Sequence, residues 1–415
     1  MILVPSHRRL LNGNKFLAVI ILSSFLLACS KKTAPVATLP KKPVETTDKK
    51  EESRIEKSDV KEQRSIALLL PFYLNSINPQ TADLKSINKA GLAIDYYQGF
   101  KFALDSLSSD GYNFKLNVWD SREQEVQIVN LARAKSVQEN DLIVGPVFPE
   151  SILTFNEFYK PENKLQISPL AASTPDQYNN PGLVTVNNTI DEHGWKVADF
   201  INKNYKPSKV NLLLINTKKT DDEKFASPIK KYIKSISENG FVIHELPNSI
   251  GLETALSKTL TNIVIVTSDD KAFVLPTIDR LYKSSRQGLK IELFGHPNWI
   301  KAQFLNVEKM QGLNTKITAS YFIDYKSEDV KNFTSRYRQE FGLEPSEFAV
   351  KGFDTGYFFG KLLGKYGTDY LNHISTEQYQ GLHNKFHFKK DEKFGYTNTE
   401  VMMLKYSGFE LQVIK

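Results

Sequence analysis

The sequence has a single cysteine, Cys29, among 415 residues. A chain with one thiol cannot form an internal disulfide and offers no cluster of thiolates to a metal ion. Its core must therefore hold the fold by itself, which is feasible at this length because the buried fraction of the surface rises with size. The 40% hydrophobic and 24% charged residues are ordinary values for a globular protein.

Motifs for catalysis and for nucleic-acid binding are also missing. The sequence contains no G-x-S-x-G, no P-loop and no H-E-x-x-H, so it indicates neither an enzyme nor a cofactor. The net charge of +7 is mild, and no arginine-rich face carries interleaved aromatic residues, which argues against a nucleic-acid partner. His383 and His387 are four apart but have no acidic or cysteine partner nearby, so we expect no metal site.

The apolar run near the start is too short to cross a membrane. Residues 16–28 are apolar apart from two serines, whereas a span needs about 20 apolar residues. Basic residues precede the run and a small residue, Ala28, ends it, which is the order of a secretory signal. An ordinary signal peptide with an incidental cysteine is one interpretation of this segment.

The residues around the cysteine favour a second interpretation. Leu26-Leu27-Ala28-Cys29 resembles the lipobox of bacterial lipoproteins, although Leu27 stands where a smaller residue is commoner. The resemblance implies a signal peptide at 1–28, acyl chains on Cys29 and therefore no free thiol in the mature chain. Each buried methylene contributes about 0.8 kcal/mol, so two or three chains anchor firmly. Ser30, not aspartate, follows the cysteine, which implies the outer membrane of a bacterial envelope, facing the periplasm.

Residues 29–64 differ in composition from the rest of the chain. Lys, Glu, Asp, Thr and Pro dominate there, and large apolar residues are rare. Such a segment cannot bury enough surface to offset its ordering entropy. We expect a disordered tether whose roughly 35 residues span about 30–35 Å.

The body alternates apolar runs with amphipathic segments. The expected strands are 66–72, 114–120, 141–147 and 164–170, then 209–216, 241–246, 262–268 and 289–295. Helical patterns lie between them, which predicts an α/β fold of parallel sheets with helices on both faces. Four strands and then four more are enough for two lobes; a single sheet of eight or more strands is the alternative. Strands at 400–406 and 409–415 are expected to finish the second lobe.

The order of these segments resembles the type I periplasmic-binding-protein fold, in particular the branched-chain amino-acid receptors. The resemblance covers 65–366 and includes ISPLAAST (167–174) after the fourth strand and a late helix pair at 333–363. It implies two lobes, each a parallel sheet flanked by helices, with a hinged cleft between them. Lobe one would comprise 65–190 plus 320–370, and lobe two 191–319 plus 371–415.

The late helix carries Gly352, Gly356 and Gly360, spaced four apart. Residues four apart lie on one face of a helix, so these glycines make a flat stripe. We expect the stripe to let this helix approach a sheet closely in the core of lobe one.

Ligands of open parallel sheets bind outside the carboxyl ends of the strands. The residues expected to bind a ligand are therefore those that follow strands: Tyr73, Phe148, Ser173, Thr174, Asp269, His296, Asn298 and Trp299. The resemblance implies that Ser173 and Thr174 hold a ligand carboxylate, although both could instead cap the next turn.

Other positions depart from the receptor pattern. The place of the receptors' lobe-two acid reads His296-Pro297-Asn298-Trp299 and holds no carboxylate. Asp269 could substitute for it or cap a helix, and an unpaired ammonium in a closed cleft would be costly, which argues against free amino acids. The aromatic residues Tyr73, Phe148 and Trp299 predict an aromatic cleft or one filled by its own side chains.

Two functions follow as expectations. The first is a lipid-anchored envelope protein that closes on a small polar solute for an ABC importer, and the resemblance to the receptors implies an amino acid-like one. The second rests on a resemblance of IALLLP and VGPV to the C-terminal domain of outer-membrane lipoproteins that activate peptidoglycan-synthesising penicillin-binding proteins. The expected partners are a small-molecule solute, the membrane through the anchor, and either an ABC permease or a peptidoglycan synthase.

Overall fold

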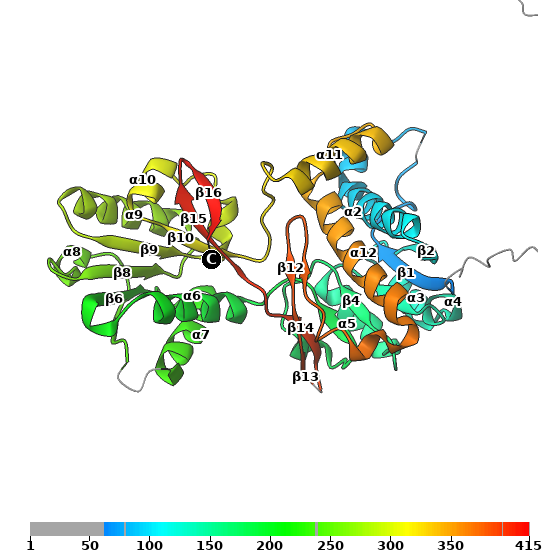
Figure 1. Cartoon of the computed structure of the whole chain (residues 1–415), viewed down its shortest axis with the longest axis horizontal. Coiled ribbons are helices and arrows are strands. Elements are labelled where there is room, and N and C mark those ends of the chain that lie inside the picture. Colours follow the sequence, from blue (N-terminus) through cyan, green and yellow to red (C-terminus); the bar gives the residue numbers. More distant parts are fainter. Residues whose placement is uncertain (1–61, 79, 237–239, 392, 415) are drawn as a thin grey trace, which may run out of the picture. The chain divides into compact units, whose positions relative to one another are not determined.

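Two sheets of mostly parallel strands, each flanked by helices, make up most of the chain from residue 64 onward (Figure 1). The computed structural model describes residues 62–414 except 79, 237–239 and 392. The expected signal peptide, the lipidation site Cys29 and nearly all of the expected tether lie outside the described residues. We call the two halves lobe one and lobe two.

Lobe one is built on a seven-stranded sheet in the order β13-β14-β5-β4-β3-β1-β2. Its strands are β1 (Arg64–Leu70), β2 (Phe114–Asp120), β3 (Leu142–Val144), β4 (Gln166–Ser168), β5 (Leu183–Thr185), β13 (Phe388–Asp391) and β14 (Gly395–Asn398). Only β13 runs antiparallel to its neighbour. Its helical segments are α2 (Leu84–Ser109), α3 (Glu125–Arg133), α4 (Lys135–Gln138), α5 (Pro149–Phe158), η1 (Pro175–Tyr178), α11 (Glu328–Phe341), α12 (Glu347–Tyr366) and η4 (Gly367–Asn372). A hairpin of β11 (Tyr379–Gln380) and β12 (Lys385–Phe386) follows η4.

Lobe two has a sheet of the same layout, in the order β16-β15-β10-β9-β8-β6-β7. Its strands are β6 (Val210–Ile215), β7 (Ile243–Leu246), β8 (Thr261–Val266), β9 (Ile291–Gly295), β10 (Lys316–Ala319), β15 (Met402–Ser407) and β16 (Glu410–Ile414). The last two strands are antiparallel to their neighbours. Its helical segments are α6 (Ile190–Asn204), η2 (Pro207–Lys209), α7 (Thr220–Ile236), α8 (Leu252–Ala255), α9 (Lys271–Arg286), η3 (Pro297–Lys301) and α10 (Val307–Gly312).

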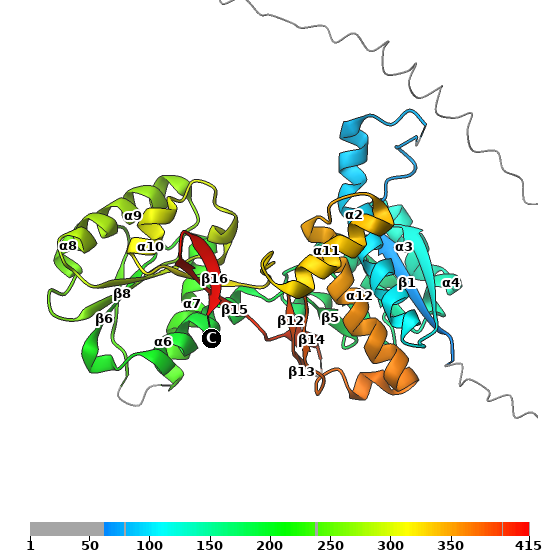
Figure 2. The same ribbon diagram turned by 45° about the horizontal axis from the view of Figure 1, so that its top comes forward.

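The continuous apolar runs of the sequence form strands that are buried on both faces, as parallel strands are. In β1, Ile66, Leu68 and Leu70 pack in the core cluster that includes α2 and α12 residues. Ala67 and Leu69 pack on the other face with α3 and α5. Lobe two repeats this arrangement, with α6 and α7 on one face of its sheet and α9 and α10 on the other (Figure 2).

The glycine stripe of α12 meets a helix, not a sheet. A Cβ at Gly352 would lie 2.1 Å from the carbonyl oxygen of Tyr96, and one at Gly356 would lie 2.9 Å from that of Phe100. Both partners belong to α2, which carries the reciprocal glycine, Gly99. The expectation that the glycine stripe allows a close approach is confirmed. The expectation that it packs on a sheet is wrong, because the backbone atoms it approaches belong to α2. Figures 1 and 2 show α12 lying along α2.

One expected lobe boundary is also corrected. The sequence analysis assigned everything after residue 370 to lobe two, but β14 pairs with β5 through Tyr396 and Val184, so β13 and β14 complete the sheet of lobe one. Only β15 and β16 belong to lobe two, as expected for the strands at 400–406 and 409–415. The chain thus passes between the sheets at 186–189, 320–327 and 399–401.

Candidate ligand-binding pocket

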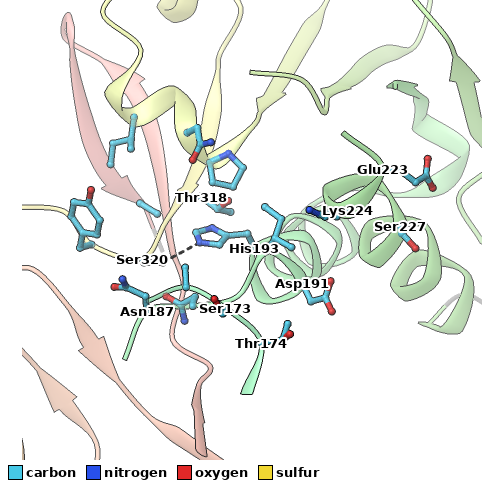
Figure 3. Close-up of a pocket in the computed structure, with 18 of the residues that line it drawn as sticks. Ser173, Thr174, Asn187, Asp191, His193, Glu223, Lys224, Ser227, Thr318 and Ser320 are labelled. Carbon is cyan, nitrogen blue, oxygen red and sulfur yellow. Dashed lines mark hydrogen bonds between the residues drawn. The ribbon is translucent and has the colours of Figure 1, made fainter. Parts of the chain in front are cut away.

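A pocket of about 1130 Å³ is lined by residues that follow strands of both sheets (Figure 3). Lobe one contributes the segments after β4 and β5, and lobe two contributes the segments after β6, β9 and β10. These are carboxyl ends of parallel strands, the edge at which open α/β sheets bind ligands. Hydroxyl and amide side chains are frequent in the lining, which includes Ser173, Thr174, Gln177, Asn187, Asn188, Thr220, Ser227, Asn298, Thr318, Ser320 and Tyr321.

Three of the eight residues expected to bind a ligand line this pocket. Ser173 and Thr174 come from the loop after β4, and Asn298 comes from η3. Thr174 precedes η1 but makes no side-chain cap; its Oγ1 accepts a hydrogen bond of 3.1 Å from Gln177 Nε2. The alternative capping role of Thr174 is therefore not what the structure shows.

Asp269 and His296 contact Asn298 but are not among the residues that line the pocket. Asn298 Nδ2 donates to Asp269 Oδ2 at 2.7 Å, and the Asn298 backbone N–H donates to His296 Nδ1 at 3.2 Å. The His296 ring is buried against Phe225. The structure therefore makes these two residues supports for Asn298.

The three aromatic candidates lie elsewhere, so the expected aromatic or self-filled cleft does not form. Trp299 is 1% exposed, donates from Nε1 to the Ser268 carbonyl at 3.0 Å, and covers Gly295, where a Cβ would lie 2.1 Å from its ring. Phe148 is 42% exposed, directly precedes α5 and is not among the residues that line the pocket.

Tyr73 is held in a turn next to β1. Its backbone has φ of 56°, and the Asp120 carboxylate accepts hydrogen bonds from the N–H groups of Phe72, Tyr73 and Leu74. Lys89 Nζ lies 4.1 Å from the centre of the Tyr73 ring. The ring is therefore occupied locally and is not among the residues that line the pocket.

The sequence analysis missed His193, which α6 places at the pocket. Thr189 caps this helix by accepting from the Glu192 N–H, and acidic residues fill its first turn, which favours a helix start at this position. His193 then faces inward with Val197 and Ile201. The only sequence signal was a polar run between a strand and an amphipathic helix.

His193 is an uncharged group at neutral pH. Burial lowers its pKa to about 3, with a smaller contribution from His296. Its Nε2 lies 3.0 Å from Ser320 Oγ, in the segment that leaves β10 (Figure 3). Burial has the opposite effect on acids of the same helix: it raises the pKa of Glu192 to about 7 and raises that of Asp191, against a smaller effect of Lys231.

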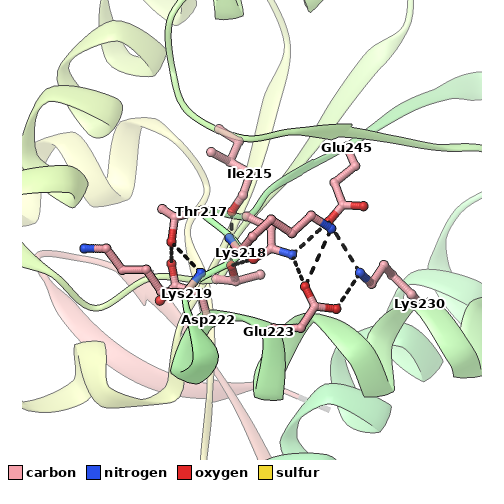
Figure 4. A network of polar contacts seen from close by, with 10 residues as sticks. Ile215, Thr217, Lys218, Lys219, Asp222, Glu223, Lys230 and Glu245 are labelled. Atoms are coloured by element: carbon pink, nitrogen blue, oxygen red, sulfur yellow. Dashed lines mark hydrogen bonds and ion pairs between the residues drawn. The ribbon is translucent and has the colours of Figure 1, made fainter.

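The lysines of the pocket wall are paired with carboxylates. Lys218 bonds Glu245 and lies 3.6 Å from Glu223, while Lys230 and Asn216 also bond both of these acids (Figure 4). The hydrogen bonds from Lys230 and Asn216 lower the pKa of Glu223.

The remaining lysines of the wall are paired in the same way. Lys224 lies 2.9 Å from Asp221, and Lys301 lies 3.5 Å from Glu347 at the start of α12.

The segments that join the lobes are hydrogen-bonded to one another at the pocket. Asn188 Nδ2, after β5, donates to the Asn398 carbonyl at the end of β14 at 2.7 Å. Asn398 Nδ2 in turn donates to the Val186 carbonyl at 3.1 Å. The first connection is thus tied to the end of β14, directly before the third connection begins.

The described residues contain no group of three or more His, Cys, Asp or Glu that could hold a metal ion. His383 instead contacts the carboxylate of Asp354 through Nδ1, and both side chains are buried in lobe one. Among the helices of residues 62–414 that are described, we find none with the length and apolar character of a membrane span.

Comparisons with solved structures show the fold. A protein assigned as a branched-chain amino acid ABC transporter from Rhodospirillum rubrum is 16% identical, with a TM-score of 0.62 over 85% of this chain and 100% of the other. An ABC transporter substrate-binding protein from Desulfitobacterium hafniense, in complex with Leu, is 13% identical (TM-score 0.52; 85% and 100% covered). A branched chain amino acid ABC transporter periplasmic ligand-binding protein from Burkholderia xenovorans is 14% identical (TM-score 0.53; 85% and 95% covered).

Comparisons at the level of sequence give no such likeness. No protein-family model matches the chain, and no curated protein matches it either. The two-lobed periplasmic-binding fold is therefore shown by structure alone.

Proposed function

We propose that this chain, which has the two-lobed fold of type I periplasmic binding proteins, is a solute-binding protein of the bacterial cell envelope that serves an ABC importer. The observation that carries the proposal is the pocket of about 1130 Å³ at the strand ends of both sheets. Pockets for small molecules commonly measure about 300–1,000 Å³, so this one has room for a small solute and water. Neither Phe148 nor Trp299 is among the residues that line it, so the aromatic plug that would favour a scaffold without a ligand is not part of the support for that alternative.

The connections between the lobes support binding by closure. Three short segments join the sheets, and hinges of this kind absorb the backbone rotation when two domains close on a ligand. Asn188 and Ser320 lie on two of these segments and also line the pocket. Contact with a solute at these residues would therefore act directly on the connections that must bend.

Binding of a solute should raise the unfolding temperature of the protein. A ligand that binds only the folded state adds RT ln(1 + [L]/Kd), which is about 2.7 kcal/mol at 100 times Kd. We expect at least one small polar solute to stabilise the wild type and the control A272W, but not A172W. Ala172 is an exposed residue of the pocket wall and Ala272 an exposed residue of α9, so only the first tryptophan occupies the pocket. Equal stabilisation of both variants, or of neither variant nor the wild type, would contradict the proposal.

The proposal includes a lipid anchor at Cys29 and a position on the outer membrane facing the periplasm. It is supported by the order of basic, apolar and small residues before the only cysteine of the sequence. Cells expressing the full chain should incorporate labelled fatty acid into the protein, and the C29S variant should not. Label that persists in C29S would rule out this site of attachment.

A further inference from the structure

Three buried polar atoms at the pocket have no hydrogen-bond partner in the part of the chain that the structure describes. They are His193 Nδ1, Thr318 Oγ1 and Asn188 Oδ1. Their residues are 6%, 0% and 2% exposed, and all three line the pocket. Buried polar atoms are nearly always paired, because an unpaired one gives up its bonds to water without replacement. A group of three at one pocket indicates positions that a ligand completes; we call them the pocket floor.

The pocket floor can donate and accept hydrogen bonds but carries no charge. Neutral imidazole holds one proton, so His193 Nδ1 donates or accepts according to which nitrogen carries it. The Thr318 hydroxyl can do either, and Asn188 Oδ1 accepts, since its Nδ2 already donates to Asn398. This set matches hydroxyl groups, which donate and accept at one oxygen atom, and amides, which donate from nitrogen and accept at oxygen.

The charged residues of the wall do not offer a free partner to an ion. Each of Lys218, Lys224 and Lys301 already has a carboxylate nearby. Asp191 is the pocket carboxylate that forms no ion pair with the described residues, and burial raises its pKa, which weakens it as a partner for an ammonium group. An ionic ligand would therefore give up its hydration on binding and would meet only neutral groups and charges that are already paired or weakened.

We infer that the pocket takes an uncharged solute that presents hydroxyl or amide groups to His193, Thr318 and Asn188, not an amino acid zwitterion or an anion. This inference rests on the proposed function, because it names the ligand class of the same pocket. Thr318 is the residue through which the assignment is best tested. Valine matches threonine in shape and replaces the hydroxyl group with a methyl group, and a matched control lies next to β10.

That control is Thr315, immediately before β10. Its Oγ1 is also buried and without a partner among the described residues, but Thr315 does not line the pocket. T315V therefore removes the same atom type from the same region without touching the ligand. T318S keeps the hydroxyl group and loses the methyl group, so it distinguishes a lost hydrogen bond from altered packing.

The experiment measures thermal shift and then calorimetric affinity with two panels of solutes. One panel contains neutral sugars, polyols, nucleosides and primary amides; the other contains amino acids, monocarboxylates and dicarboxylates. We expect a member of the neutral panel to bind the wild type, T315V and T318S alike and to bind T318V about three- to tenfold more weakly.

The possible outcomes separate this inference from the proposed function. Stabilisation only by charged solutes would leave solute binding intact and overturn the neutral class. A neutral ligand whose affinity is the same for T318V and the wild type would overturn the assignment of the pocket floor. No stabilisation by either panel would overturn the proposed function and this inference with it.

Discussion

The G99A variant should lose about 3 kcal/mol or more of unfolding free energy. Gly99 lies on α2 where α12 crosses it, and a Cβ there would lie 1.8 Å from the carbonyl oxygen of Ala349. The clash is with backbone, so no side-chain rotation relieves it, and α12 would have to move away from α2. That movement would open the cluster in which Phe358, Phe359 and Leu363 pack on the sheet of lobe one.

The same helix provides the control. Gly91 also lies on α2, but a Cβ there would meet nothing within 4 Å. Alanine is the better helix former, so G91A should gain about 0.5–1 kcal/mol. Urea denaturation followed by circular dichroism measures both variants. Similar stabilities for G99A and G91A would show that α12 does not need the close approach.

The second large effect is expected at Asp354, where D354N should cost about 3–5 kcal/mol of unfolding free energy. The carboxylate is 0% exposed and accepts hydrogen bonds from the backbone N–H groups of Leu382, His383 and Asn384 at 2.8, 3.0 and 3.2 Å. It also accepts from the Tyr379 hydroxyl group at 3.1 Å and contacts His383 Nδ1. An amide would turn two of its own donors toward these donors and leave several buried groups unpaired.

An exposed aspartate of lobe one makes the matched comparison. Asp105 pairs with Lys101 on the surface of α2, and its side chain is 52% exposed. Exposed pairs of this kind contribute about 0–1 kcal/mol, so D105N should be nearly neutral. Chemical denaturation measures the unfolding free energies of the two variants under the same conditions. A D354N protein as stable as D105N would show that the carboxylate does not hold the β11–β12 hairpin.

The strands that the sequence predicted correctly are those whose signal is local. Both faces of β1, β6, β8 and β9 are covered, so their sequences are nearly continuous apolar runs. β5 reads Leu-Val-Thr and β10 reads Lys-Ile-Thr-Ala, so neither is a continuous apolar run. β14 reads Gly-Tyr-Thr-Asn and is a strand of lobe one because it pairs with β5, more than 200 residues earlier. No local pattern records such a pairing.

The residues of the site were also predictable only where their signal is local. Ser173, Thr174 and Asn298 could be proposed because they follow apolar runs, and strand ends are where such folds bind ligands. His193 and Thr318 lie inside a helix and a strand, and only the meeting of the two sheets brings them to the pocket. Trp299 was misplaced because Gly295 leaves room for the indole to fold back into the core, which depends on packing across one turn.

The last four strands that the structure describes are divided between the two sheets, and this has a consequence for folding during synthesis. β13 and β14 complete one sheet and β15 and β16 the other, and all four are translated after every helix of the protein that the structure describes. A nascent chain that has reached α12 therefore holds two unfinished sheets, each with an open edge next to β5 or β10. Unpaired edges invite association with other chains. The sheet of lobe one is completed first, by β13 and β14, and that of lobe two only when β15 and β16 follow. The emerging polypeptide is therefore most exposed to association until these four strands have left the ribosome.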